Sequence, residues 1–204
     1  MILHSFANEP EVIKLFEETK TFAEFKNKLE ELAISLPQTK PIFYNLKKDM
    51  PDNVKKIKGD MFELFCELLV SCIGSHSHIG LGQYRPVNLS DDEGVDAYAV
   101  NTLLEKSAVQ CKFVSNPNYE FTANDSNLPN FLIEARFNGI PWEEDTKTKR
   151  LFLITSAKGI HYHTISKWRN CVFIINGDTI STLTDNNLLF WSDCLGKLIQ
   201  HQKE

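Results

Sequence analysis

The segment between residues 94 and 114 constrains the fold most strongly, because it contains two short apolar runs separated by a polar break. The runs cover residues 94–100 and 108–114, and residues 101–107 between them are short enough to form a hairpin connection. Short apolar runs joined in this way are typical of two neighbouring antiparallel strands. The sequence therefore predicts a hairpin at the centre of the chain.

The second run carries two polar side chains inside an otherwise apolar strand. Gln110 and Lys112 are two positions apart, so they point to the same side of the strand. The side chains that alternate with them are expected to face a core: Val109, Cys111 and Phe113. Burying an amide and an ammonium group is costly unless they have partners. Asp96 on the first run, together with a metal ion, would supply such partners.

Three short motifs, in order along the chain, resemble the PD-(D/E)XK nuclease superfamily. Asp96 on one strand is followed on the next by Gln-x-Lys at residues 110–112. This form is most similar to the Mrr-like branch of restriction endonuclease-like domains, which also carries a Gly-x-x-Phe-Glu helix, here residues 59–63. The Pro that usually precedes the Asp is replaced by Val95, and Gln110 replaces a carboxylate; both departures occur in the Mrr-like branch. The resemblance spans residues 58–191.

The resemblance implies an α/β fold of the restriction endonuclease-like type, with a mixed central sheet flanked by helices. Residues 56–204 would form this nuclease domain. Helical periodicity between residues 9 and 35 indicates that residues 1–55 form a helical amino-terminal extension. The extension either covers an edge or face of the domain or contacts a partner or DNA.

The resemblance also implies a role for each residue of the candidate site. Asp96 would be the central metal ligand, and Glu63 would bind the metal directly or through water. Gln110 and Cys111 would offer a side-chain and a backbone carbonyl oxygen, respectively. Lys112 would polarise the attacking water or neutralise the phosphate. Mg2+ prefers such oxygen ligands, and Mn2+ would substitute for it; whether one or two metals act stays open.

Other polar residues are weaker candidates. Lys158, His161 and His163 are candidates for a contact with phosphate or DNA. A zinc site at the two imidazoles is disfavoured, because no Cys lies at a useful spacing from them. The basic clusters at residues 55–58 and 147–150 are either DNA-binding patches or solvated loop charge.

One helical stripe of acidic residues also lies beside the expected site. Asp60, Glu63 and Glu67 are spaced three and four positions apart on a helix predicted for residues 59–73. We expect Asp60 and Glu67 to be solvated, and only Glu63 to belong to the site.

The remaining periodicity predicts further elements of an α/β domain. Continuous apolar runs at residues 150–156 and 171–177 are typical of strands covered on both faces. Helices are predicted for residues 128–137 and, as one or two segments, for residues 183–198.

Composition narrows the class of protein. The chain has 204 residues, 42% of them hydrophobic, and a net charge of -5, which argues against non-specific coating of DNA but not against a DNA enzyme. Its five cysteines include no Cys-x-x-Cys pair, so we expect reduced thiols and a cytoplasmic location. Neither a signal peptide nor a membrane-spanning run is apparent, and no Walker loop, nucleophile elbow or dinucleotide fingerprint is present.

These features predict a metal-dependent DNA endonuclease domain. A catalytically inactive DNA-binding module of the same fold is the alternative, and an interaction domain with an accidental site is a third interpretation. By resemblance, a helicase, translocase or methyltransferase would act with the domain, fused or separate. Cutting both strands would require a homodimer on DNA.

Overall fold

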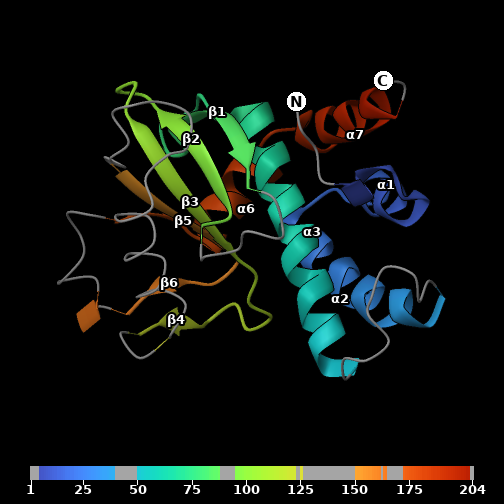
Figure 1. Cartoon of the computed structure of the whole chain (residues 1–204). Coiled ribbons are helices and arrows are strands. Elements are labelled where there is room, and N and C mark those ends of the chain that lie inside the picture. Colours follow the sequence, from blue (N-terminus) through green and yellow to red (C-terminus); the bar gives the residue numbers. More distant parts are fainter. Residues whose placement is uncertain are drawn as a thin grey trace.

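The protein has a mixed α/β fold in which helices flank a five-stranded sheet (Figure 1). The computed structural model describes residues 5–39, 50–87, 95–122, 125, 150–161, 163–164 and 172–202. The strand order is β1-β2-β3-β5-β7. The bounds of the strands are β1 Leu81–Pro86, β2 Ala97–Asn101, β3 Lys106–Lys112, β5 Arg150–Thr155 and β7 Val172–Ile175. Two short strands, β4 (Glu120–Phe121) and β6 (Gly159–Ile160), form a separate parallel pair.

The predicted hairpin is confirmed as the antiparallel pair β2 and β3. Ala97 lies opposite Val109, and Val100 lies opposite Lys106. Asn101 organises the connection, because its side-chain oxygen accepts hydrogen bonds from the backbone N–H groups of Leu103 and Glu105, both at 2.9 Å. The sheet is mixed because β2 is antiparallel to both of its neighbours, β1 and β3, whereas β3, β5 and β7 are parallel.

The two continuous apolar runs form β5 and β7, but the expectation that both faces are covered holds only for β5. All residues of β5 after Arg150 are buried. In β7, Phe173 is 45% exposed. β7 is the last strand in the sheet order, and Phe173 packs on Phe152, with the ring centroids 5.2 Å apart. The guanidinium group of Arg150 lies 5.3 Å from the centroid of the Phe173 ring, so a cation covers part of this apolar surface.

The predicted central helix is longer than its sequence pattern indicates. Helix α3 extends over Met50–Ile73 rather than beginning at Gly59. Pro51 lies in its first turn, where the missing N–H group is not needed by the helix. The expected domain boundary between residues 55 and 56 falls inside this helix, so α3 belongs to both regions of the chain.

The predicted helical amino-terminal region is present and shares its core with the rest of the protein. It consists of a 3-10 turn, η1 (Ser5–Asn8), and helices α1 (Pro10–Glu17) and α2 (Phe22–Thr39). The Phe25 ring stacks on Phe65 of α3 with centroids 4.6 Å apart. It also stacks on Trp191 at 5.9 Å. Because these rings are buried together, the amino-terminal helices pack on α3 and the carboxy-terminal helix rather than on a sheet edge.

The carboxy-terminal segment forms two helices, α6 (Gly177–Asp185) and α7 (Phe190–His201). Helix α6 begins at Asn176, whose side-chain oxygen accepts a hydrogen bond from the Thr179 N–H group at 2.9 Å. The helix predicted at residues 128–137 and the basic residues 147–149 lie outside the described residues. Among the helices that are described, none has the length and apolar character needed to cross a membrane.

Candidate functional site

The carboxylate of Asp96 is built into the end of the central sheet. Asp96 directly precedes β2 and is 8% exposed. Its backbone N–H group donates to the Val109 carbonyl oxygen at 3.0 Å, and its Oδ2 atom accepts a hydrogen bond from the Cys111 N–H group at 2.5 Å. The side chain therefore takes the place of a backbone acceptor where the β2–β3 ladder ends. This fixes the carboxylate beside the Gln-x-Lys segment.

A second carboxylate, Glu63, approaches the same segment from α3. Burial raises the pKa of the Cys111 thiol, and the negative charges of Asp96 and Glu63 raise it further. The pKa of Cys66, one turn after Glu63, rises for the same reasons. Both carboxylates thus lie close enough to the Cys111 side chain to raise its pKa.

Strand β3 presents its residues in the alternation that the sequence predicts. Val109 and Cys111 belong to the core beneath α3, and Ala108 belongs to the core on the other face. Gln110 and Lys112 share the face of Ala108, where Gln110 is 1% exposed and Lys112 is half-buried. The structure therefore groups Glu63, Asp96 and Cys111, and places Gln110 and Lys112 on the opposite face of the same strand end.

The backbone carbonyl of Cys111 faces the side of the strand on which Asp96 lies. The Val109 carbonyl oxygen accepts a hydrogen bond from the Asp96 N–H group. The Lys112 carbonyl oxygen instead points toward β5 and accepts a hydrogen bond from the Thr155 hydroxyl group at 2.7 Å. Backbone groups of successive strand residues point to opposite sides, so the Cys111 carbonyl points toward Asp96.

The chemistry of this donor set matches a hard divalent cation. Carboxylate, amide and backbone carbonyl groups all offer oxygen, which Mg2+ and Mn2+ prefer over the nitrogen and sulfur ligands typical of Zn2+. Within the described ranges, no group of three or more His, Cys, Asp or Glu side chains is arranged to hold a metal. The predicted set contains only two carboxylates, so the amide and carbonyl oxygens would have to complete it.

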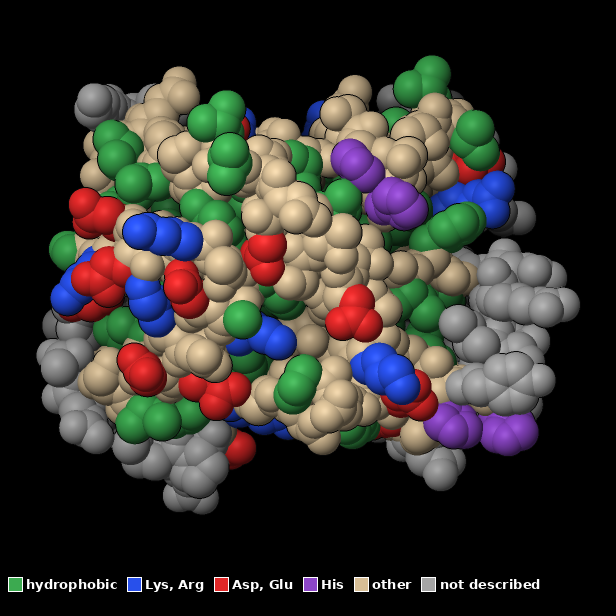
Figure 2. Space-filling view, turned by 180° about the vertical axis from the view of Figure 1, so that it is seen from behind, with side chains coloured by type: hydrophobic (Ala, Val, Ile, Leu, Met, Phe, Trp, Pro, Cys, Tyr) green, Lys and Arg blue, Asp and Glu red, His purple; other side chains and the backbone are tan. Residues whose placement is uncertain are grey.

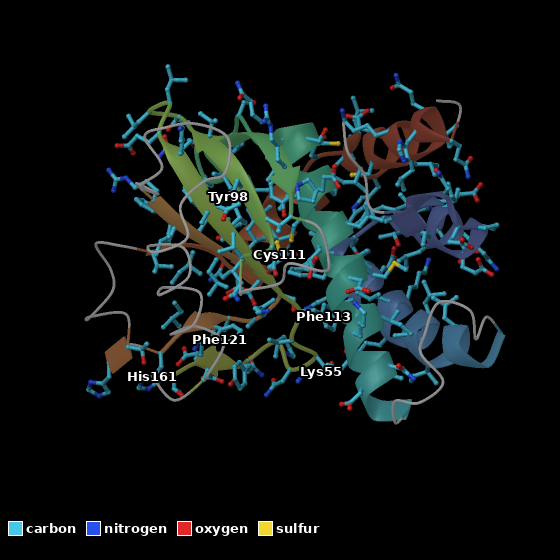
Figure 3. All side chains as sticks on the ribbon, in the orientation of Figure 1. Lys55, Tyr98, Cys111, Phe113, Phe121 and His161 are labelled. Carbon is cyan, nitrogen blue, oxygen red and sulfur yellow. The ribbon has the colours of Figure 1, made fainter. Side chains whose placement is uncertain are left out.

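A lysine that the sequence assigned only to a charged cluster lies at the end of β3. Lys58 Nζ is 3.0 Å from Ser115 Oγ and 5.7 Å from the centroid of the Phe113 ring. Figure 3 shows Phe113 next to α3 and Lys55 on α3. The cluster is helical rather than a loop, and Lys56 pairs with Asp60 at 3.0 Å. Only the packing of α3 against β3 reveals that Lys58 reaches the strand end.

The candidate DNA contacts around β6 lie away from Cys111, as the positions of His161 and Cys111 in Figure 3 show. Lys158 pairs with Glu120 through Nζ and Oε1 at 3.0 Å. The rings of His161 and His163 have centroids 5.4 Å apart. The structure therefore does not bring these three residues into the group around Asp96.

Glu67 contradicts the expectation that it is solvated. It is 1% exposed, and its two carboxyl oxygens have no hydrogen-bond partner. Burial raises the pKa of Glu67 to about 8. Glu67 lines a cavity of about 760 Å³ between α3, β1 and α7. The pattern of a single helix does not show that other elements cover this side of it.

The surface seen in Figure 2 carries basic and acidic side chains intermixed rather than one continuous basic area. This distribution agrees with the net charge of -5. Any contact with DNA on this face would therefore depend on local groups.

Comparisons with known proteins leave the family open. No family model and no curated protein matches this chain. Among solved structures, the crystal structure of protein VC1899 from Vibrio cholerae is similar over 95% of this chain, with 11% sequence identity and a TM-score of 0.48. The chain spans 58% of the length of that protein.

Proposed function

We propose that this protein is a metal-dependent DNA endonuclease with a restriction endonuclease-like fold, which hydrolyses phosphodiester bonds. The observation that carries the proposal is the position of the Asp96 carboxylate, hydrogen-bonded to the Cys111 N–H group within the Gln-x-Lys segment. Glu63 joins this group from α3. Two carboxylates beside a strand that ends in lysine form a suitable arrangement for binding a metal ion and a phosphate.

The order of elements supports the same proposal. The resemblance implies a helix with Glu63, a strand with Asp96, a strand with Gln110 and Lys112, then a helix and two further strands; that second helix would lie outside the described residues. The described chain follows this order as α3, β1, β2, β3, β5 and β7. The hairpin is antiparallel and the later strands are parallel to β3.

Each residue has a definite task in this proposal. Asp96 and Glu63 would hold Mg2+ together with the backbone carbonyl oxygen of Cys111. The resemblance also assigns Gln110 as a ligand, but its side chain lies on the other face of β3 from this group. When bound, the metal would supply charge stabilisation at the phosphate and an activated water. Lys112 would place a positive charge at the phosphate. The hydrogen bond from the Cys111 N–H group would keep the Asp96 carboxylate oriented.

Plasmid cleavage tests the proposal most directly. Supercoiled and single-stranded DNA would be incubated with the protein in Mg2+, Mn2+ or EDTA. We expect metal-dependent nicking or linearisation, reduced about 100-fold or more by Asp96→Asn and by Lys112→Ala, because each removes a charge at the reacting phosphate. The matched controls are Asp178→Asn and Lys14→Ala, which alter exposed charges on α6 and α1 and should cut as the wild type does.

Two results would overturn the proposal. Cleavage that Asp96→Asn leaves intact would place any activity elsewhere. Binding of DNA by the wild type without cleavage under all metal conditions would favour the catalytically inactive DNA-binding module. The buried amide of Gln110, in place of a carboxylate, is the feature that keeps this second function in view, because a neutral ligand holds Mg2+ less strongly.

The wider setting follows from the same proposal. The partner would be DNA, in the cytoplasm. Cutting of both strands would require two copies of the chain. A helicase, translocase or methyltransferase, fused or separate, would deliver the substrate. Sedimentation of the protein on duplex DNA would show a dimer if both strands are cut in one event.

A further inference from the structure

Two cysteines meet where α3 packs on α7. Cys72 lies in the last turn of α3, and Cys194 lies in the first half of α7. Their Sγ atoms are 3.8 Å apart, although the two residues are 122 positions apart in sequence. The S–S bond of a disulfide is about 2.05 Å long, so a short further approach of two sulfur atoms that already touch would join them.

The two thiols differ in access to solvent. Cys72 is half-buried and lines the cavity between α3, β1 and α7. Beyond its helical backbone, a cysteine has only a methylene group and a thiol, so the exposed part of Cys72 lies at or beside its sulfur. Cys194 is 0% exposed and belongs to the core. A small reagent in the cavity therefore reaches Cys72 before it reaches Cys194.

The two thiols also differ in how readily they ionise. The Cys194 thiol donates a hydrogen bond to the Cys72 sulfur, which lowers the pKa of Cys72. Burial and the charge of Asp193 oppose this change, whereas the positive charge of Lys197, in the wall of the same cavity, adds to it. Burial raises the pKa of Cys194. An accessible thiolate beside a second thiol is the arrangement typical of redox-sensitive cysteines.

The other cysteines of the described chain lack this combination. Cys66 and Cys111 are 0% and 4% exposed, and burial raises the pKa of both thiols. Buried thiols that keep their protons react slowly with dissolved oxidants. Among the described cysteines, selective oxidation is therefore expected at Cys72.

We propose that Cys72 and Cys194 form a redox-sensitive pair, in which a peroxide oxidises Cys72 and the product is a disulfide that ties α3 to α7. With hydrogen peroxide, the Cys72 thiolate attacks one oxygen and the O–O bond breaks. This leaves a sulfenic acid on Cys72, and the departing hydroxide takes up a proton to become water. The Cys194 sulfur then bonds to the Cys72 sulfur, the S–O bond breaks, and the hydroxyl leaves with the Cys194 proton as a second water. The two sulfurs together lose two electrons to the peroxide. The inference does not depend on the proposed nuclease activity.

Peptide mapping after peroxide treatment tests the pair. The reduced protein would be exposed to hydrogen peroxide, its remaining thiols blocked in denaturant, and the chain digested without reduction. We expect one peptide that links Cys72 to Cys194 and the loss of two of the chain's five thiols, both reversed by dithiothreitol. Cys72→Ser should abolish the linked peptide. Cys66→Ala, which removes a buried thiol elsewhere on α3, should leave it unchanged.

A second variant captures the intermediate. In Cys194→Ala the sulfenic acid on Cys72 has no thiol partner within the pair. Dimedone, which reacts with sulfenic acids, should therefore label Cys72 about tenfold more in this variant than in the wild type. Circular dichroism would show that each variant is folded.

Thermal unfolding gives an independent readout. A bond between residues so far apart in sequence restricts the unfolded chain, so the oxidised wild type should melt about 5 °C or more above the reduced protein. The same peroxide treatment should not raise the melting temperature of Cys72→Ser.

Three results would overturn the proposal. In the first, peroxide leaves the Cys72 and Cys194 thiols free, or consumes Cys66 and Cys111 as fast. In the second, the linkage joins two chains, seen as a dimer on a non-reducing gel. In the third, the oxidised protein melts below the reduced one, because a bond that forms from the native arrangement should not destabilise it.

Discussion

Glu63 and Glu67 are one helical turn apart on α3, yet they differ in burial and in the groups that surround them. Glu63 is half-buried and lies near Asp96 and Cys111, where a metal or a phosphate would bind. Glu67 is buried without hydrogen-bond partners in the wall of a separate cavity. Residues four apart share a helix face, but α7 and β1 close over that face only at Glu67. The difference shows that the neighbouring elements, rather than the helical spacing, decide the state of each carboxyl group.

The largest expected effect tests whether the parts of α3 around Glu63 and Glu67 depend on one core. Phe65 is fully buried, lies between Glu63 and Glu67 in sequence, and packs on Phe25 and Trp191. We expect Phe65→Ala to lower the free energy of unfolding by about 3–5 kcal/mol, because it leaves a large cavity among aromatic rings. Urea denaturation followed by tryptophan fluorescence would measure the change.

Ile34→Ala serves as the matched control, since Ile34 is 55% exposed on α2 and its truncation should change stability by less than about 1 kcal/mol. If Phe65→Ala were equally mild, the amino-terminal helices would not share a core with the sheet, and the parts of α3 around Glu63 and Glu67 would be stabilised separately.

A smaller change in stability, in this case a gain, distinguishes Glu67 from Glu63. Between the ordinary pKa of 4.5 and about 8, folded protein keeps the proton on Glu67 while the unfolded chain loses it. The folded state then binds more protons, so the wild type loses stability as pH rises through this window. Glu67→Gln should match the wild type near pH 5. At pH 8 and above it should be more stable by about 3 kcal/mol, allowing for water in the cavity.

Thermal unfolding of both proteins across pH 5–9 would reveal this divergence. Glu31→Gln, on the exposed surface of α2, should follow the wild type throughout. Parallel curves for wild type and Glu67→Gln would mean that the Glu67 carboxyl is solvated after all. The two glutamates would then not differ in the solvation of their carboxyl groups.

The sequence predicted which helices and strands form better than it predicted which of their faces other elements bury. The β2–β3 hairpin and the alternation of Gln110 with Cys111 follow from short-range spacing, and both are present. The burial of Glu67 and the reach of Lys58 to Ser115 depend on contacts between elements distant in sequence. No periodicity within one helix contains that information. The nuclease roles of Glu63, Asp96, Gln110 and Lys112 stay a prediction that rests on resemblance and position.

The smallest effect compares the Cys72 thiol, which lines the cavity, with the Cys66 and Cys111 thiols near Glu63 and Asp96. Cys72 lines the cavity and is half-buried. A hydrogen bond from Cys194, at an Sγ–Sγ distance of 3.8 Å, lowers the pKa of Cys72. Cys66 and Cys111, by contrast, are 0% and 4% exposed. Iodoacetamide should therefore modify Cys72 about tenfold faster than either, because reaction requires an accessible thiolate.

Peptide mapping by mass spectrometry during a short alkylation would give the rate at each position. Equal rates at all three cysteines would instead show that α3 separates from β3 and α7 under native conditions. Neither the cavity nor the group around Asp96 would then persist long enough to select a ligand.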